Sequence, residues 1–430
     1  MKIFFFTLGC KVNQYETVIL KNIFLKNKFK ISQNEQSADV FIINSCTVTS
    51  SSDRKINRLI NKIKNIKQNA IIVLTGCFPQ AFPERYDFFN KVDIVTGNTN
   101  KFKLPELLNK HLENKEKIVE IENFEKNNTL KNFYIEKVFK TPRAFIKIQD
   151  GCNKYCTYCI IPKARGMLKS KPIEKIVLEA KNVSENRCCE AVLTGINLSC
   201  YGKDLKNVSL IDAVKAVSTV EKIKRIRLSS LEPNLLKLKD FISLKNEEKF
   251  CPHFHFSLQS GSNSTLKRMG RFYDKNSYKK TVDIIFKLFK NPSITTDIIV
   301  GFPGETNEEF EETLKFVKKI GFFKVHIFPY SKRKGTKAAE MLNQVSNEEK
   351  KQRAKILKKV AEETNLNFLK TQKGKILKVL FETKNNETFV GYSENYSPVK
   401  VFNKNNLCGK IKNVIIKDVE KTSLKGEIIN

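Results

Sequence analysis

The sequence predicts a multidomain α/β protein with an N-terminal α/β domain containing a parallel sheet, a central partial (β/α) barrel and a small C-terminal β-barrel. Three observations predict this fold class. The chain has 430 residues, which is too long for one ordinary hydrophobic core. Short apolar runs alternate with stretches of helical period, a pattern typical of parallel sheets covered by helices. The last sixty residues change to short strand patterns separated by Asn, Gly and Ser turns.

The first domain is predicted over residues 1–112. Helices are expected over 13–28 and 51–67, where isoleucine and valine recur at helical spacing. The strand candidates, each ending in Gly, Asn, Ser or Cys, are KIFFFTLGC, DVFIINSC, AIIVLTGC and VDIVTGN. Residues 113–140 are charged and without a clear period, so we expect an irregular connector.

A second domain is predicted over residues 141–370. Its strand candidates are AFIKIQ, AVLTGIN, RIRLSS, HFHFSLQS, ITTDIIVGFPG and VHIFPYS. Strand–helix repeats of this length favour an open or partial α/β barrel. Ser346 and Glu349 match a capping box that opens a long basic helix ending near residue 370. Residues 371–430 are then expected to form the small β-barrel.

The charge of the chain favours a polyanionic partner. Lys and Arg number 78 against 45 acidic residues, and the last sixty residues contain 11 Lys against 6 acids. Basic surfaces gain affinity for nucleic acid by releasing counterions. The alternative is codon bias in an AT-rich genome, which also explains abundant Lys, Asn, Ile and Phe. No apolar run approaches the roughly 20 residues of a membrane span, so we expect a cytoplasmic protein with no membrane partner.

In that compartment the eleven cysteines are expected to be reduced, as metal ligands or packed side chains. Cys152, Cys156 and Cys159 follow the first strand of the predicted barrel with the spacing C-x₃-C-x₂-C. Iron–sulfur clusters usually have four cysteine ligands, so three ligands leave one iron open. An open iron suits a cofactor with adjacent amino and carboxylate groups, such as S-adenosylmethionine. The alternative is a zinc site completed by Cys188 or Cys251.

A second group of three cysteines is separated by long intervals. Cys10, Cys46 and Cys77 each end one of the first three predicted strands. Because the carboxyl ends of parallel strands share one edge of a sheet, these side chains can converge on a second three-thiolate cluster. The alternative is buried structural cysteines.

Further candidates lie at the carboxyl ends of the predicted barrel strands, where α/β folds bind their ligands. The stretch from Asp297 to Gly301 is one of them, and its glycines permit a close approach of the backbone. His253 and His255 lie two apart, so they share one side of a strand, and we favour packing or cofactor contact over metal ligation. The remaining cofactor candidates are Thr194, Gly195, Asn197, Arg227, Ser229 and Gln259. We interpret the five remaining cysteines as structural: Cys188, Cys189, Cys200, Cys251 and Cys408.

Taken together, these motifs resemble those of the radical S-adenosylmethionine methylthiotransferases. The matching stretches cover nearly the whole chain in the family's order: TLGCKVNQYE, NSCTVT, LTGC, IQDGCNKYCTYCIIPKARG, LTGIN, RLSSLEP, LQSGSNSTLKRM, TTDIIVGFPGET and FPYSKRKGT. The first motif, GCKVNQYE, is most similar to that of the MtaB-type branch, which acts on N6-threonylcarbamoyladenosine in tRNA.

The resemblance implies two 4Fe–4S clusters and S-adenosylmethionine as cofactors. Cys152, Cys156 and Cys159 would hold the cluster that cleaves S-adenosylmethionine, and Tyr158 would occupy the position whose backbone contacts adenine. The auxiliary cluster, on Cys10, Cys46 and Cys77, would carry the sulfur to be inserted. One S-adenosylmethionine would supply the methyl group, and a second would yield the radical that activates C2 of adenine.

The resemblance also implies partners. The tail would be a TRAM-like RNA-binding domain, and the substrate a modified adenosine beside the anticodon in a tRNA loop. An electron donor and a sulfur donor, both unidentified, would be needed. The alternatives are a sister methylthiotransferase acting on isopentenyladenosine or on a ribosomal-protein aspartate, and a non-catalytic zinc- and RNA-binding protein.

Overall fold

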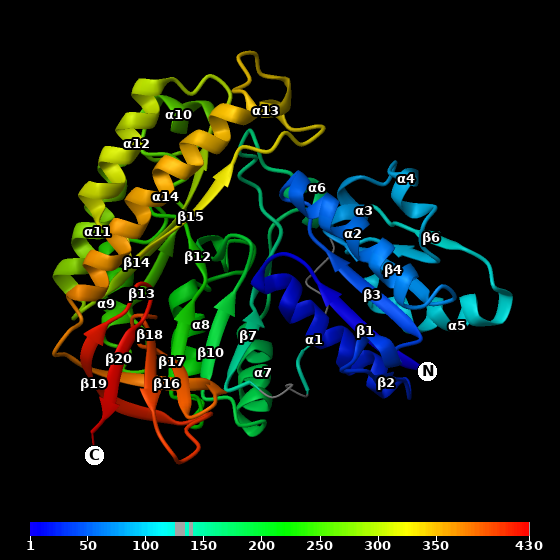
Figure 1. Cartoon of the computed structure of the whole chain (residues 1–430), viewed down its shortest axis with the longest axis horizontal. Coiled ribbons are helices and arrows are strands. Elements are labelled where there is room, and N and C mark those ends of the chain that lie inside the picture. Colours follow the sequence, from blue (N-terminus) through cyan, green and yellow to red (C-terminus); the bar gives the residue numbers. More distant parts are fainter. Residues whose placement is uncertain (125–133, 137–140, 430) are drawn as a thin grey trace. The chain divides into compact units, whose positions relative to one another are not determined.

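The computed structural model describes residues 1–124, 134–136 and 141–429, so part of the predicted connector 113–140 lies outside the described residues. The chain divides into two compact units (Figure 1). Unit 1 contains Met1–Lys137, Gln149–Lys171 and Ser331–Ala339. Unit 2 contains Val138–Ile148, Pro172–Tyr330 and Glu340–Asn430. In the described part of the chain, no helix is long and apolar enough to cross a membrane.

Unit 1 is built on a six-stranded parallel sheet with the order β2-β1-β3-β4-β5-β6. Its strands are β1 (Lys2–Thr7), β2 (Lys30–Ile31), β3 (Val40–Ser45), β4 (Ile71–Gly76), β5 (Ile94–Thr96) and β6 (Ile118–Glu120). Its helices are α1 (Lys11–Lys26), η1 (Glu35–Ser37), α2 (Ser50–Ile66), α3 (Cys77–Ala81), α4 (Tyr86–Phe89), η2 (Lys101–Lys103) and α5 (Leu104–Asn114). The predicted N-terminal parallel sheet is therefore confirmed, and β6 arises within the stretch we expected to be irregular.

The apolar residues of β3 explain why this sheet is covered on both faces. All six residues of the strand are buried. Phe41 and Ile43 belong to the core beside α2, whereas Val40 and Ile42 belong to the core beside α1 and α5. Because successive side chains of a strand point to opposite faces, an uninterrupted apolar run requires a helical layer on each side.

Two segments distant in the sequence complete unit 1. Residues 149–171 contribute β8 (Gln149–Asp150), which pairs antiparallel with β9 (Lys169–Ser170), and the short helix α6 (Ile161–Arg165). Ile160 and Ala164 pack in the same core as the α2 face of the sheet. Residues 331–339 are held by Arg333, which donates to Asp53 Oδ2 at 2.7 Å and to Thr47 Oγ1 at 2.6 Å. The loop that carries Cys152, Cys156 and Cys159, called the cysteine loop below, therefore belongs to the same compact unit as the N-terminal sheet.

Unit 2 contains the predicted partial barrel, formed by two parallel sheets with the orders β11-β10-β7 and β12-β13-β14-β15. Its strands are β7 (Arg143–Lys147), β10 (Glu190–Thr194), β11 (Arg225–Leu228), β12 (Ser230–Leu231), β13 (His253–Phe256), β14 (Ser293–Val300) and β15 (Lys324–Pro329). Its helices are α7 (Ile173–Glu185), η3 (Leu198–Cys200), α8 (Leu210–Ser218), α9 (Leu238–Lys245), α10 (Asn263–Arg268), α11 (Lys275–Leu288), α12 (Asn307–Ile320) and α14 (Asn347–Lys370). Helix α13 (Lys337–Glu340) follows β15.

Helices cover one face of the four-stranded sheet (Figure 1). Phe254 and Phe256 of β13 contact Phe241 of α9, and Phe256 also contacts Tyr278 of α11. His253 and His255, which alternate with these phenylalanines, therefore point to the opposite, helix-free face. The predicted sharing of one strand face by the two histidines is confirmed.

The tail forms a closed five-stranded barrel with the order β16-β17-β18-β20-β19, as expected from its strand and turn pattern. Its strands are β16 (Ile376–Asn385), β17 (Thr388–Ser393), β18 (Pro398–Phe402), β19 (Ile411–Val419) and β20 (Leu424–Ile428). Alternating residues such as Val399 and Val401 fill its core, together with Leu369 at the end of α14. Closure removes free sheet edges, which would otherwise favour aggregation.

The loop joining β17 and β18 docks against the first residues of the partial-barrel strands. Arg225 donates to Tyr392 O at 2.9 Å, and Arg227 donates to Glu394 O at 2.9 Å. Arg227 also donates to Glu190 Oε1 at 3.0 Å, with both side chains 1% exposed. The Tyr396 ring stacks on His253 with centroids 4.8 Å apart. Because Glu190, Arg225 and His253 begin their strands, this loop closes the amino-terminal end of the partial barrel.

The charges at this contact compensate one another. Burial raises the pKa of Glu190, but the positive charge of Arg227, and then those of Arg225 and Arg143, outweigh it and hold the pKa below its usual value. A buried carboxylate is tolerated only with such partners. The tail is thereby fixed to the sheet through ionised groups and backbone carbonyls together.

We predict that Arg227→Met loosens the tail. The loop carbonyls lose a charged donor, which costs about 1–3 kcal/mol of docking free energy. Hydrogen exchange of the backbone amides over 388–402 should then be about tenfold faster. Lys222→Met is the control, because Lys222 makes an ion pair with Glu185 in which both side chains are at least 60% exposed. Equal exchange in the two variants would contradict the anchoring role.

Candidate metal centre and cofactor site

Three neighbouring strands of unit 1 lead into the three separated cysteines. β1, β3 and β4 lie side by side, and Cys46 and Cys77 directly follow β3 and β4. Gly9 adopts φ +101°, and a Cβ there would lie 2.6 Å from Cys46 Cβ. Gly76 adopts φ +103°, and a Cβ there would lie 2.7 Å from the carbonyl oxygen of Ser45. The glycines before Cys10 and Cys77 thus allow the close approach of the three chain segments.

The three sulfurs face a common site. Asn13 Oδ1 lies 3.7 Å from Cys10 Sγ and 4.0 Å from Cys77 Sγ. Burial, together with the neighbouring thiols of Cys77 and Cys10, raises the pKa of Cys46 to about 11. Asn13 therefore reaches two of the thiols, and Gly9 packs against the third, Cys46.

A buried network of charges lies beside this site. Arg165 of α6 donates to Glu16 Oε1 at 2.9 Å, to Asn13 Oδ1 at 2.6 Å and to Asp150 Oδ1 at 3.1 Å. Lys101 donates to Glu16 Oε2 at 2.7 Å, and the two side chains are 1% and 3% exposed. Burial opposes the charge of Arg165, but Cys77, Glu16 and Asp150 raise its pKa well above the usual value. Arg165 therefore keeps its positive charge beside Cys77, whereas burial lowers the pKa of Lys101.

Unsatisfied polar atoms test whether these residues fit an iron–sulfur cluster. Arg165 Nε, Asn44 Oδ1 and Asn98 Oδ1 are buried and have no hydrogen-bond partner among the residues that the structure describes. Asn98 Nδ2 lies 3.5 Å from Cys77 Sγ. Clusters bound by thiolates are anionic and accept hydrogen bonds at sulfur. Three thiols, a buried guanidinium with an unused donor and a nearby amide donor fit such a group.

The cysteine loop is closed at its base. Cys152 N donates to Gly166 O at 3.1 Å, and the ion pair of Arg165 with Asp150 joins the same two ends of the loop. Cys159 N donates to Cys156 O at 2.9 Å, which places these two residues on one turn. All three cysteines are partly exposed, as accessible ligands must be. Tyr158 lies on the turn just before Cys159.

The predicted cofactor residues of unit 2 occupy different environments. Thr194 ends β10 and precedes Gly195, whereas Asn197 donates to Glu232 Oε2 at 2.9 Å. Ser229 Oγ is buried and forms no hydrogen bond with the described residues. Gln259 follows β13 with φ +70°. The guanidinium of Arg227, also a predicted cofactor residue, donates to Glu190 and to the loop after β17, and in this structure it anchors the tail.

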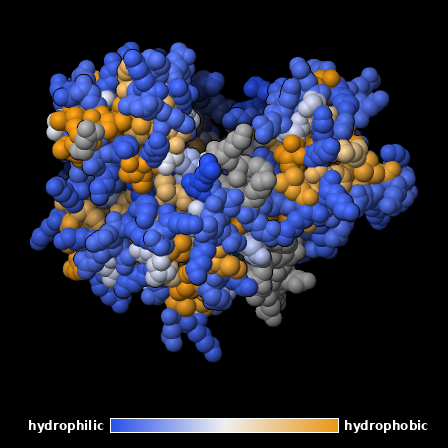
Figure 2. All heavy atoms as spheres, turned by 90° about the horizontal axis from the view of Figure 1, so that it is seen from below, coloured by the Kyte–Doolittle hydropathy of each residue, from blue (hydrophilic) through white to orange (hydrophobic). Residues whose placement is uncertain are grey.

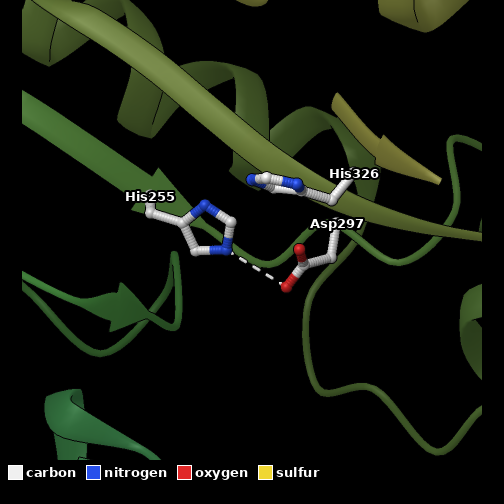
Figure 3. A group of neighbouring side chains, drawn as sticks. All are labelled: His255, Asp297 and His326. Atoms are coloured by element: carbon white, nitrogen blue, oxygen red, sulfur yellow. Dashed lines mark hydrogen bonds and ion pairs between the residues drawn. The ribbon is translucent and has the colours of Figure 1, made fainter. Parts of the chain in front are cut away.

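A further cluster lies on the helix-free face of the four-stranded sheet (Figure 3). His255 Nε2 lies 3.1 Å from Asp297 Oδ2, and His255 Nδ1 lies 2.9 Å from Thr295 Oγ1. One ligand atom each from His255, Asp297 and His326 falls within 4.8 Å of the others. Sequence reasoning singled out His255 and Asp297 but missed His326. Both strands were predicted, but the pairing of His326 with Asp297 appears only in the register between β14 and β15.

The fold and the cysteine loop define a radical S-adenosylmethionine protein. Residues 146–317 match the radical SAM superfamily, residues 370–429 match the TRAM domain, and residues 2–97 match uncharacterized protein family UPF0004. The solved structure of the radical S-adenosylmethionine methyltransferase TsrM from Kitasatospora setae shares this fold with a TM-score of 0.57. That match covers 79% of this chain and 75% of TsrM at 12% identity.

Relatives that match over nearly their full length identify the family within the radical S-adenosylmethionine proteins. The threonylcarbamoyladenosine tRNA methylthiotransferase MtaB of Aquifex aeolicus is 40% identical over 93% of this chain and 96% of its own length. MtaB of Bacillus subtilis is 36% identical, covering 96% and 93% of the two chains. The tRNA-2-methylthio-N(6)-dimethylallyladenosine synthase of Clostridium tetani is 34% identical, covering 98% and 95%. The chain belongs to the radical SAM tRNA methylthiotransferase family, which confirms the predicted family and excludes a non-catalytic zinc protein.

We predict that Glu16→Gln destabilises the cluster-free protein. The substitution leaves Arg165 and Lys101 buried with less compensating charge, which costs about 3–5 kcal/mol. Urea unfolding of reduced protein at neutral pH measures this loss. Glu122→Gln is the matched control, because Glu122 also pairs with a lysine, Lys103, but both side chains are more than 40% exposed. The control should change stability by about 0.5 kcal/mol or less, and a similar loss in both variants would refute the role of burial.

Proposed function

We propose that this protein inserts a methylthio group at C2 of N6-threonylcarbamoyladenosine beside the anticodon of tRNA. The observation that carries the proposal is the pair of three-cysteine groups within one compact unit, one on the radical SAM loop and one at the strand ends. The 40% and 36% identical relatives carry the threonylcarbamoyladenosine name, which favours this substrate over the isopentenyl one.

The radical SAM family implies S-adenosylmethionine and a 4Fe–4S cluster. We assign that cluster to Cys152, Cys156 and Cys159, and a second 4Fe–4S cluster to Cys10, Cys46 and Cys77. The first cluster supplies, when bound, the electron that cleaves S-adenosylmethionine to a carbon radical. The second assignment is supported by the converging thiols and by the unused donor of Arg165.

The residues of the chain then divide the work of binding and positioning. The strand ends at Thr194, Gly195, Asn197, Ser229 and Gln259 bind S-adenosylmethionine, since parallel α/β folds bind ligands at this edge. Ser229 supports this role, because its buried hydroxyl has no other partner among the described residues.

Tyr158 contributes a backbone contact to the adenine of the cofactor. The closed amino-terminal end of the partial barrel keeps water from entering behind the reacting base, which protects a radical. The pairing of Arg165 with Glu16 and Asp150 holds the loop that carries the first cluster.

The nucleic-acid partner is the anticodon loop of tRNA. The TRAM domain and the formal charge of +33 support an RNA substrate. Hydrophilic residues cover most of the face shown in Figure 2, and hydrophobic ones form separate patches. An electron donor and a sulfur donor, both unidentified, complete the reaction.

The substrate is tested by mass spectrometry of tRNA nucleosides from cells with and without the gene. We expect the methylthio form of threonylcarbamoyladenosine to disappear and to return with the wild-type gene. Loss of methylthiolated isopentenyladenosine instead would assign the chain to the sister reaction.

We predict that Cys46→Ala and Cys156→Ala each lower the iron content from about eight to about four atoms per chain, as expected for two 4Fe–4S clusters. Cys46→Ala should still form 5′-deoxyadenosine from S-adenosylmethionine, whereas Cys156→Ala should form none. Each variant is reconstituted anaerobically with iron and sulfide. Its iron content and the 5′-deoxyadenosine that it forms are then measured. Cys408→Ala, in the tail, is the control and should keep all the iron. Equal loss of cleavage in the first two variants would contradict the separate roles.

A further inference from the structure

The helix-free face of the four-stranded sheet is open above the docked tail loop. Asp297 and Ile299 are partly exposed on this face, whereas Ile298 and Val300 are fully buried on the other. On the neighbouring strand, Lys324 is exposed and Phe328 is 40% exposed. Since residues two apart on a strand share a face, Lys324, His326 and Phe328 form one row beside Asp297.

This row has a polar end and an aromatic end. His326 and Asp297 are register partners, and Lys324 pairs with Thr295 one step closer to the amino-terminal ends of the strands. Phe328 lies two residues beyond His326, roughly 6.5 Å further along the strand. The aromatic ring is thus nearer to the strand ends that bind cofactor, and the charged groups are deeper in the partial barrel.

The groups around Asp297 are held in place by hydrogen bonds. His255 Nε2 contacts Asp297 Oδ2 at 3.1 Å (Figure 3). Ser257 Oγ donates to the same oxygen at 3.3 Å, and Thr295 Oγ1 lies 2.9 Å from the other nitrogen of His255. Burial alone raises the pKa of Asp297, but His255, and then His326, lower it below its usual value. A carboxylate at a fixed place can accept a hydrogen bond from a ligand, and the side chain of Lys324 on the neighbouring strand can bind an anion.

The two classes of substrate named for the relatives differ in the side chain on N6. A threonylcarbamoyl group carries a carboxylate, a hydroxyl and N–H groups. A dimethylallyl group is purely hydrocarbon. Charged groups lining a site disfavour a hydrocarbon ligand, because they lose water and gain no partner. The row therefore matches the polar substrate.

We propose that Lys324 and His326 bind the carboxylate of the N6 threonylcarbamoyl group, that Asp297 accepts a hydrogen bond from the hydroxyl or an N–H of the same group, and that Phe328 stacks on the purine. This inference rests on the proposed function and deepens it, because it names the groups that select the substrate. In this orientation the N6 side chain points into the partial barrel and the purine lies toward the cofactor end of the strands. Stacking of a splayed base on an aromatic ring is a common mode of RNA recognition.

The test compares binding of three anticodon stem–loop RNAs to the full chain by fluorescence anisotropy. Their target base is threonylcarbamoyladenosine, dimethylallyladenosine or unmodified adenosine. The wild type should bind the first at least about tenfold more tightly than the other two, as expected for charge-assisted hydrogen bonds. Lys324→Met and His326→Leu should each remove most of this preference and leave the affinity for unmodified RNA unchanged.

Lys319→Met on α12 is the matched control, since it removes the same charge from an exposed position. It should keep the full preference. In reconstituted enzyme, the two test variants should raise KM for the threonylcarbamoyl RNA with little change in kcat. Circular dichroism shows whether each variant is folded. If Lys324→Met or His326→Leu is unfolded, the test rests on the other variant. The assignment of Lys324 and His326 to the carboxylate is overturned if the folded variants still prefer the threonylcarbamoyl RNA. It is also overturned if Lys319→Met loses this preference to the same extent.

Two further outcomes separate this inference from the proposed function. A wild type that methylthiolates only the dimethylallyl RNA refutes both. If the wild type acts on threonylcarbamoyl RNA and the variants keep their preference for it, only the role given to Lys324 and His326 is refuted. Binding in excess EDTA should be unchanged, and a preference that depends on added Mn²⁺ or Zn²⁺ would assign His255, Asp297 and His326 to a metal ion instead.

Discussion

The buried contact of Arg165 with Glu16 is the constraint on which the arrangement of unit 1 depends. Removing a guanidinium and a carboxylate from water costs several kcal/mol per ion unless geometry and hydrogen bonding repay it. Here Glu16 is shared by Arg165 and Lys101, which come from segments 64 residues apart. The α1 helix, the cysteine loop and the stretch before α5 must therefore meet in one arrangement. The same contact brings a donor to the separated cysteines and fixes the loop of the adjacent ones.

A second charge group has the same role in unit 2. Glu190 is surrounded by Arg143, Arg225 and Arg227, at 3.9, 3.6 and 3.0 Å. Arg225 and Arg227 extend the group to the carbonyls of the loop after β17. The TRAM barrel is consequently docked on the amino-terminal end of the partial barrel and is not a domain on a free linker. A base bound by that barrel would be held at a defined distance from the strand ends, which lowers the entropic cost of positioning it.

Local patterns explain what the sequence could predict. Strand ends and the C-x₃-C-x₂-C spacing are visible without any long-range contact, so the fold class and all six proposed cluster ligands followed from them. Arg165 was not recognisable, because its partner Glu16 lies 149 residues away. Arg227 was a cofactor candidate because it lies near the carboxyl end of a predicted barrel strand, and its contact with the tail loop, 167 residues later in the chain, could not be foreseen from the sequence. His326 was missed because exposed histidines on an edge strand resemble ordinary surface residues until the register with Asp297 is known.

On the helix-free face of the four-stranded sheet, different side chains form successive layers from the amino-terminal to the carboxyl-terminal ends of the strands. Tyr396 and His253 close the amino-terminal end by stacking, and His255 with Asp297 forms the next layer. Phe328 and the strand ends follow, where the backbone is free to meet a cofactor. Since the tail closes the amino-terminal end, a substrate of this face would approach from the carboxyl-terminal side of the strands. A base that entered in this way would place its N6 substituent against these fixed polar groups. Specificity and radical chemistry can therefore be set by different layers of one sheet, and changes in the polar layer would alter the substrate without touching the residues that hold the clusters.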